Sequence, residues 1–310
     1  MKESNPVLVV AHADYASDLV ALDEDAIAQC APADRMQSMG VTLPFNSHAA
    51  RAQEGIPYFI AMDSINFQFW DVAETGEFLR YRREGLVGAL AMQQAFLEAW
   101  EAQADELSHL SGAGRTRAVI EALGQRIAVE GVSRFFGDIP AAAARTGILL
   151  EVLGDAGRLI EVSAKLYVAL VLRGRLGWEE AELLARTFPL AYGDRYLKKA
   201  QLTLMFIAGQ WRGRDCGLEV TAAADYQLPK ILRAMGILRY APELAARVDG
   251  QQLIDAESRE ERAIRAATVL ACDMLAAHLR CSVPEVDFWL WVNRNQARGA
   301  KFHLTRTTAY

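Results

Sequence analysis

Two aspartates stand where a carboxylate could do chemistry, each beside a helical pattern. Asp225 comes directly before the amphipathic run 226–236, and Asp287 follows Pro284 in an aromatic stretch. A buried carboxylate can stabilise a developing positive charge or take a proton from water. An aspartate at a helix start is more commonly an N-cap, which accepts hydrogen bonds from the first N–H groups of the helix. Both interpretations remain open for each residue.

Other familiar catalytic patterns are absent from the sequence. It has no G-x-x-x-x-G-K-[ST], G-x-S-x-G or H-E-x-x-H motif, and Gly112–Gly114 lacks the third glycine of a dinucleotide-binding turn. The five histidines and four cysteines are scattered, and no C-x-x-C pair occurs. We therefore expect no metal site, no disulfide framework and no cofactor.

Charge and hydropathy exclude further classes. A net charge of −6 gives no overall attraction to a polyanion, so we expect no binding to duplex nucleic acid. The longest apolar runs, 202–208 and 168–172, are far shorter than the roughly 20 residues of a membrane span. Residues 1–10 lack the basic start and long apolar stretch of a secretory signal. The sequence therefore predicts a cytoplasmic protein that does not enter a membrane.

The elements that must position these residues are mostly α-helices. Apolar residues recur at helical spacing, and the pattern predicts helices over 24–38, 140–153, 157–173, 178–187, 195–210, 226–235, 259–280 and 284–294. Aromatic and β-branched residues over 57–70 predict a short β-hairpin or strand there. With 52% hydrophobic residues and no long linker, residues 1–310 are expected to form one compact domain with room for two lobes.

Residues 178–201 outline a helical hairpin. Two predicted helices flank the turn 188–194, and Asp225 follows further along the chain. This order resembles the core of the helix-hairpin-helix base-excision glycosylases, in which an aspartate stabilises the sugar cation as the base departs. Those enzymes hold a DNA phosphate on a Gly-x-Gly turn, whereas this turn ends in Asp194. The acid disfavours duplex binding.

Four blocks of sequence resemble the queuosine salvage family, enzymes that release the base queuine from queuosine 5′-monophosphate. The blocks are 63–70 (Asp-Ser-Ile-Asn-Phe-Gln-Phe-Trp), 196–202, 224–240, and a last one made of 261–266, 286–291 and 302–310. Several unrelated strings thus occur in the same order as in the family, from about residue 45 to the C-terminus. One departure is Ala223, where the family has an aromatic residue two positions before the aspartate.

The resemblance implies hydrolysis of the N-glycosidic bond of a free nucleotide, so that queuine can be salvaged for tRNA modification. Asp225 is then the catalytic carboxylate, flanked by Ala223 and Tyr226 in the binding site. Queuine is a 7-deazaguanine and lacks the N7 atom that usually accepts a proton. We hypothesise that Asp287 instead holds the N1–H and the exocyclic amine of the base.

The remaining candidates for substrate binding are aromatic, amide and basic side chains. A stacking wall for the base could come from Phe67, Phe69, Trp70, Phe288 and Trp289, although aromatic residues are more often core. Asn66 offers either a turn amide or a specific donor and acceptor. For the 5′-phosphate the candidates are Lys199, Arg306, His303 and His48, each of which could also be a solvated surface charge.

Two other interpretations remain open. The chain could be a nucleic-acid base glycosylase built on the same helical hairpin. It could also be a non-enzymatic all-α binding protein, in which each acid named above caps a helix and each aromatic residue is core.

Overall fold

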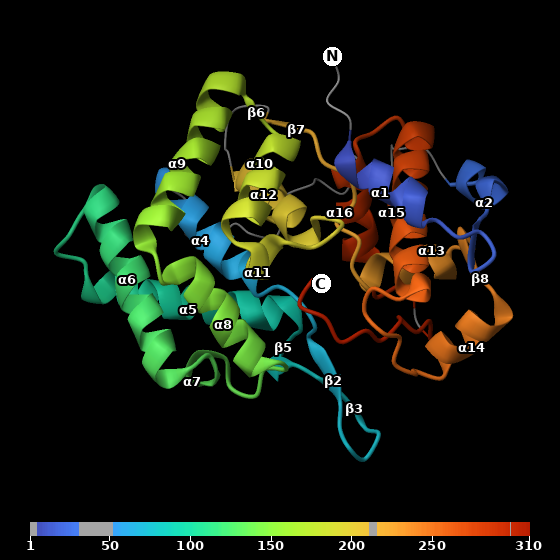
Figure 1. Ribbon diagram of the computed structural model, residues 1–310, viewed down its shortest axis with the longest axis horizontal. Coiled ribbons are helices and arrows are strands. Elements are labelled where there is room, and N and C mark those ends of the chain that lie inside the picture. Colours follow the sequence, from blue (N-terminus) through green and yellow to red (C-terminus); the bar gives the residue numbers. More distant parts are fainter. Residues whose placement is uncertain (1–4, 31–51, 211–215, 298) are drawn as a thin grey trace.

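The computed structural model describes residues 5–30, 52–210, 216–297 and 299–310, and it confirms a mostly α-helical fold (Figure 1). The helices are α1 (Pro6–Asp14), α2 (Glu24–Ala28), α4 (Ala52–Ser64), α5 (Ala89–Glu106), α6 (Gly112–Glu130), α7 (Ser133–Phe136), α8 (Ala142–Leu153), α9 (Ala156–Arg173), α10 (Trp178–Thr187), α11 (Pro189–Tyr192), α12 (Lys198–Gln210), α13 (Gln227–Ala234), α14 (Pro242–Asp249), α15 (Arg259–Leu279) and α16 (Val283–Asn293).

The strands are short and form pairs. Three pairs are antiparallel, namely β1 (Val20–Leu22) with β8 (Leu238–Tyr240), β2 (Trp70–Val72) with β3 (Phe78–Arg80), and β4 (Arg82–Arg83) with β5 (Leu86–Val87). The fourth pair, β6 (Arg175–Leu176) with β7 (Gly217–Leu218), is parallel. No larger sheet is built from the described residues, so helix packing carries the fold.

Local signals placed most helices correctly. The predicted ranges 157–173, 178–187, 226–235 and 284–294 coincide with α9, α10, α13 and α16 to within a residue or two. Pro284 lies in the first turn of α16, where its missing N–H removes no hydrogen bond. Of the range 24–38, α2 covers the first part, and residues 31–38 lie outside the described residues.

The extended segment expected over 57–70 is wrong for residues 57–64. Helix α4 continues to Ser64 and contains Pro57 in its interior. Residues 55–64 of α4 are buried because the helix packs against α8, α9 and α12, and this burial overrides the β preference of side chains such as Tyr58 and Phe59. A hairpin does occur, but it begins at Trp70, which pairs with Arg80.

The buried apolar side chains of the described residues form two main hydrophobic clusters. The larger one is built mainly on α4 to α12, and the smaller one on α13 to α16 with β1 and β8. Figure 1 shows the C-terminal segment between these two sets of helices. A third, small cluster joins them and consists of Trp70, Tyr226, Phe302, Leu304 and Tyr310. The site described below lies at this junction.

The described helices were also compared with what a bilayer crossing requires. No single one of them has both the length and the apolar composition of a membrane span, and α15 and α16 meet the test only as a pair bent by 108°.

The core packing of α8 yields a stability prediction. Leu149 is fully buried in the larger cluster, so Leu149→Ala should lower the free energy of unfolding by about 2–5 kcal/mol through lost burial and a residual cavity. Chemical denaturation measures this change. Val129→Ala, at a side chain that is 86% exposed, is the control and should change stability by less than about 0.5 kcal/mol. Equal effects of the two substitutions would contradict this assignment of the core.

Candidate active site

A cavity of about 610 Å³ opens where the two sets of helices meet. Its walls come from the turn after α4, the β2–β3 hairpin, the β4–β5 pair with the start of α5, helix α12, the loop before α13 with the first turn of α13, helix α16 and the C-terminal segment. The sequence-predicted residues that line it are Asn66, Phe67, Phe69, Trp70, Ala223, Asp225, Tyr226, Asp287 and Phe288. Residues far apart in sequence therefore surround one space of the size that small-molecule ligands occupy.

Asp225 is partly buried at the start of α13. Its Oδ1 accepts hydrogen bonds from the N–H groups of Gln227, at 2.7 Å, and Leu228, at 3.1 Å, so its side chain caps the helix as expected, although the N-cap position itself is the next residue, Tyr226. Oδ2 has no hydrogen-bond partner within the described part of the chain. Burial raises the pKa of Asp225, and the positive charge of Lys198 opposes that shift. Capping thus fixes the orientation of the carboxylate and leaves one oxygen for the cavity.

Asp287 is the second acid in the cavity wall. It is 5% exposed, and its Oδ2 accepts a hydrogen bond of 2.7 Å from the N–H of Ala223. Burial raises the pKa of Asp287 to about 7, the Ala223 N–H opposes the shift, and the negative charge of Asp225 adds to it. Asp225 and Asp287 therefore form an interacting pair, in which Asp287 exchanges its proton near neutral pH.

Lys198, rather than the predicted Lys199, lines the cavity. The Nζ of Lys198 donates to the carbonyl of Asn66 at 3.0 Å, and its positive charge opposes the raised pKa values of both acids. The Nζ of Lys199 instead donates to the carbonyl of Ser64 at 2.7 Å, and burial lowers the pKa of Lys199 to about 7. Lys199 thus stabilises the end of α4.

The turn after α4 depends on a third buried cation, Arg145. Its guanidinium donates to the carbonyls of Phe67 and Gln68 and lies 4.2 Å from the ring centroid of Phe67. Gln68 has a φ of 34°, a backbone conformation that side chains rarely adopt. The side chain of Asn66 donates to Asp63 at 2.7 Å, which is the turn-amide role. Buried cations on successive carbonyls therefore shape this wall.

Two other predicted phosphate ligands, His303 and Arg306, do not line the cavity. His303 is 1% exposed, its Nε2 lies 3.1 Å from the hydroxyl of Tyr310, and burial lowers the pKa of His303 to about 3, so it is neutral at pH 7. Arg306 is exposed and pairs with Asp71 at 3.0 Å. His48 lies outside the described residues.

The cations that do line the cavity, besides Lys198, are Arg80, Arg82, Lys230 and Arg294, and the sequence analysis missed them. Burial lowers the pKa of Lys230, and the charges of Arg80 and Arg294 lower it further, which places three positive groups near one another. The Nζ of Lys230 donates to the carbonyl of Arg294 at 3.1 Å. The sequence did contain a signal for Arg294. Asp287, Trp291 and Arg294 are spaced four and three residues apart, and this helical spacing places them on one face of α16.

Aromatic rings form much of the remaining wall. Tyr226 and Phe302 lie 4.6 Å apart between ring centroids, and Trp70 stacks on Phe78 at 6.2 Å. The Nε1 of Trp70 is buried and has no hydrogen-bond partner among the described residues. Of the five predicted stacking residues only Trp289 does not line the cavity. The wall can therefore accept a planar group.

Across the described ranges no three His, Cys, Asp or Glu side chains come together as metal ligands.

Fold and cavity together define a mostly α-helical protein with paired carboxylates and a group of cations around a site of nucleotide size. Comparison with known proteins gives the family. The model of the family described as "Queuosine salvage protein" matches residues 194–310, which include both acids. A protein of Sphaerobacter thermophilus named queuosine 5′-phosphate N-glycosylase/hydrolase is 30% identical over 93% of this chain and 92% of that protein. The chain therefore belongs to the queuosine salvage protein family.

Eukaryotic relatives carry the same name. The protein of Dictyostelium discoideum is 25% identical over 82% of this chain and 77% of its own length. That of Mus musculus is 24% identical over 83% of this chain and 82% of its own length. The chain is thus similar to these relatives along most of its length.

The coupling between the two acids can be tested directly. Asp225→Asn should lower the pKa of Asp287, because the negative charge at position 225 raises it. Lys198→Met should raise the pKa of Asp287, because the Lys198 charge lowers it. Carboxyl ¹³C NMR titration of protein labelled at aspartate measures both shifts. An unchanged titration in both variants would show that these groups do not interact.

Proposed function

We propose that this chain is a hydrolase that cleaves the N-glycosidic bond of queuosine 5′-monophosphate and releases queuine. The observation that carries the proposal is the placement of Asp225, which lines a cavity of about 610 Å³ and whose Oδ1 is fixed by two backbone N–H groups. The relatives named above carry this activity in their names, which supports the same chemistry here.

Asp225 acts at the anomeric carbon. As the C–N bond stretches, positive charge develops on the ribose, and a fixed carboxylate in a partly desolvated site stabilises it without reorganising. The same carboxylate can take a proton from the attacking water. The water hydroxyl ends on the sugar and its proton ends on the departing base, so the products are queuine and ribose 5-phosphate.

Asp287 holds the base. Its Oδ2 is already bound by the N–H of Ala223, which leaves Oδ1 for the N1–H and the exocyclic amine of the deazaguanine. With a pKa of about 7, Asp287 is mainly an acceptor above neutral pH and mainly a neutral acid below it. Phe288, Tyr226 and Trp70 provide apolar surface for the planar base.

The 5′-phosphate binds at Arg80, Lys230 and Arg294. Burial and the positive charge of Arg80 lower the pKa of both Lys230 and Arg294, and an anion that entered the cavity beside them would offset this cost. Arg294, at the C-cap of α16, is about two helical turns from Asp287 in the middle of that helix, so base and phosphate contact the same helix at different points along its length. This set replaces the cations expected from the sequence.

The two alternative functions have less support. In the helical hairpin, the carboxylate of Asp194 accepts hydrogen bonds from Arg265 and from the N–H of Lys198, so an acid occupies the position where a DNA glycosylase would bind phosphate. A purely structural role accounts for the cap made by Asp225, but not for its second oxygen in the cavity or for the group of cations nearby.

The catalytic role of Asp225 predicts the effect of its amide. Asp225→Asn keeps the cap acceptor and removes the charge, so kcat for queuine release should fall by about 10³-fold while KM changes little. Chromatography of free queuine measures both constants. Asp155→Asn, which caps α9 through the N–H of Arg158 far from the cavity, is the matched control and should keep its activity. Full turnover by Asp225→Asn would refute this role.

The phosphate site predicts a change confined to one substrate. Lys230→Met and Arg294→Met should each raise KM for the 5′-monophosphate about tenfold, because a charge-assisted contact is lost, and leave KM for the nucleoside unchanged. Arg117→Met, on the exposed face of α6, is the control. A variant that raised KM equally for both substrates would show that the cation does not contact phosphate.

A further inference from the structure

The residues directly before Asp225 are held by buried side chains from three helices. The Oε1 of Gln201 on α12 accepts from the N–H of Thr221 at 2.8 Å. On α16, Asp287 accepts from the N–H of Ala223 at 2.7 Å. The Nε of Arg265 on α15 donates to the carbonyl of Ala224 at 3.2 Å, directly beside the catalytic candidate. This short segment belongs to no helix or strand, so its shape depends on these contacts.

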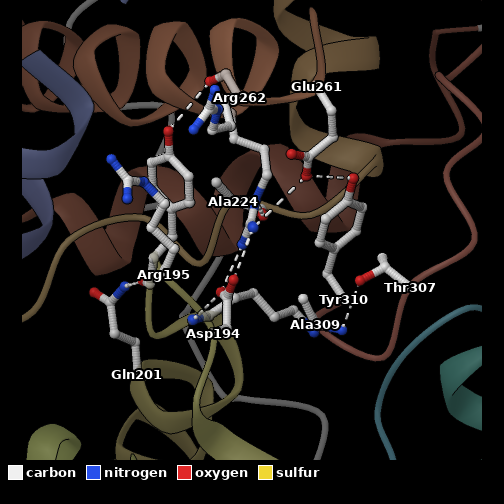
Figure 2. A network of polar contacts seen from close by, with 12 residues as sticks. Asp194, Arg195, Gln201, Ala224, Glu261, Arg262, Thr307, Ala309 and Tyr310 are labelled. Carbon is white, nitrogen blue, oxygen red and sulfur yellow. Dashed lines mark hydrogen bonds and ion pairs between the residues drawn. The ribbon is translucent and has the colours of Figure 1, made fainter. Parts of the chain in front are cut away.

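Arg265 also forms a buried, bidentate ion pair with Asp194. The two N–O distances are 2.8 and 2.6 Å, and the two side chains are 0% and 2% exposed. The Oδ2 of Asp194 additionally accepts from the N–H of Lys198 at 3.0 Å, which caps α12. Figure 2 shows Asp194 and Ala224 close together in this network. The pair therefore connects the loop of Asp225 with the helix start that presents Lys198 to the cavity.

The same guanidinium reaches the C-terminal segment. Its Nη1 lies 3.7 Å from Glu261, which accepts from the hydroxyl of Tyr310 at 2.9 Å, and both residues are labelled in Figure 2. The guanidinium also lies 4.5 Å from the ring centroid of Tyr310, a cavity residue. The backbone carbonyl of Tyr310 accepts from the N–H of Gln68 in the turn after α4. One cation thus contacts three parts of the cavity wall.

We propose that Arg265, together with Asp194, is a positioning residue for the hydrolysis, an inference that rests on the proposed function. The pair holds the Asp225 carboxylate at a fixed position relative to Lys198. Neither Arg265 nor Asp194 lines the cavity, so they act through Ala224 and the start of α12 and not by touching the substrate. A planar guanidinium suits this task, because it serves both carboxylate oxygens and a carbonyl at fixed angles.

Arg265→Lys tests the proposal. The ammonium keeps the charge but cannot reproduce the bidentate pair together with the Ala224 contact. A displacement of reacting groups by about 1 Å lowers rates about a hundredfold, so kcat should fall by about that factor with KM within about threefold. Amide hydrogen exchange at Gln227 and Leu228, which donate to Asp225, should become faster without any substrate present.

A matched control separates positioning from general stability. Arg173→Lys alters another arginine paired with two acids, Glu179 and Glu180, outside the cavity wall, and should leave kcat and exchange at Gln227 and Leu228 unchanged. The double variant Asp194→Leu with Arg265→Met removes both charges of the bidentate pair together, and Glu261 keeps the hydroxyl of Tyr310 as its hydrogen-bond donor. It should fold and show the same low kcat and fast exchange.

The outcomes are distinct. Wild-type kcat and exchange in Arg265→Lys, or in the double variant if the single one does not fold, would overturn the positioning role. Wild-type protein that releases no queuine would instead overturn the proposed function. In that case the exchange of the two amides still decides whether the pair holds Asp225 in place.

Discussion

The buried pair of Arg265 and Asp194 is the contact on which the arrangement of the site depends. Two charges with almost no solvent exposure are stable only while each keeps its partner and the remaining donors are satisfied. This requirement fixes the start of α12, the loop before α13 and α15 relative to one another. The ion pair thereby determines the positions of the Asp225 carboxylate and the Lys198 ammonium.

Similar physics shapes the opposite wall. The turn after α4 has carbonyl groups that no helix or strand satisfies, and Lys198, Lys199 and Arg145 donate to them. Buried cations therefore donate hydrogen bonds to backbone carbonyls in this turn, whereas elsewhere cations face the cavity. Two of these cations also act on Asp63 of α4. Desolvation raises the pKa of Asp63 to about 6, and the positive charges of Lys198 and Lys199 partly oppose this shift.

The sequence was sufficient where the determining interactions are local. Apolar spacing and proline placement located α9, α10, α13 and α16, and the cap made by Asp225 involves only neighbours along the chain. Tertiary packing decided the rest. Helix α4 forms over aromatic residues because neighbouring helices bury them. The register of the turn before α12 decides which of two adjacent lysines enters the cavity, and Leu197, with a φ of 51°, lies in that turn. Composition cannot reveal this choice.

The phosphate site shows the same boundary between local and distant information. Arg80, Lys230 and Arg294 belong to a hairpin and two helices, and only the assembled fold brings them together. The central claim, that this cavity hydrolyses a queuosine nucleotide, is tested most directly by a time course of purified protein with queuosine 5′-monophosphate. We expect free queuine and ribose 5-phosphate to appear in equal amounts until the substrate is consumed. Intact substrate after many hours at a high protein concentration would contradict it.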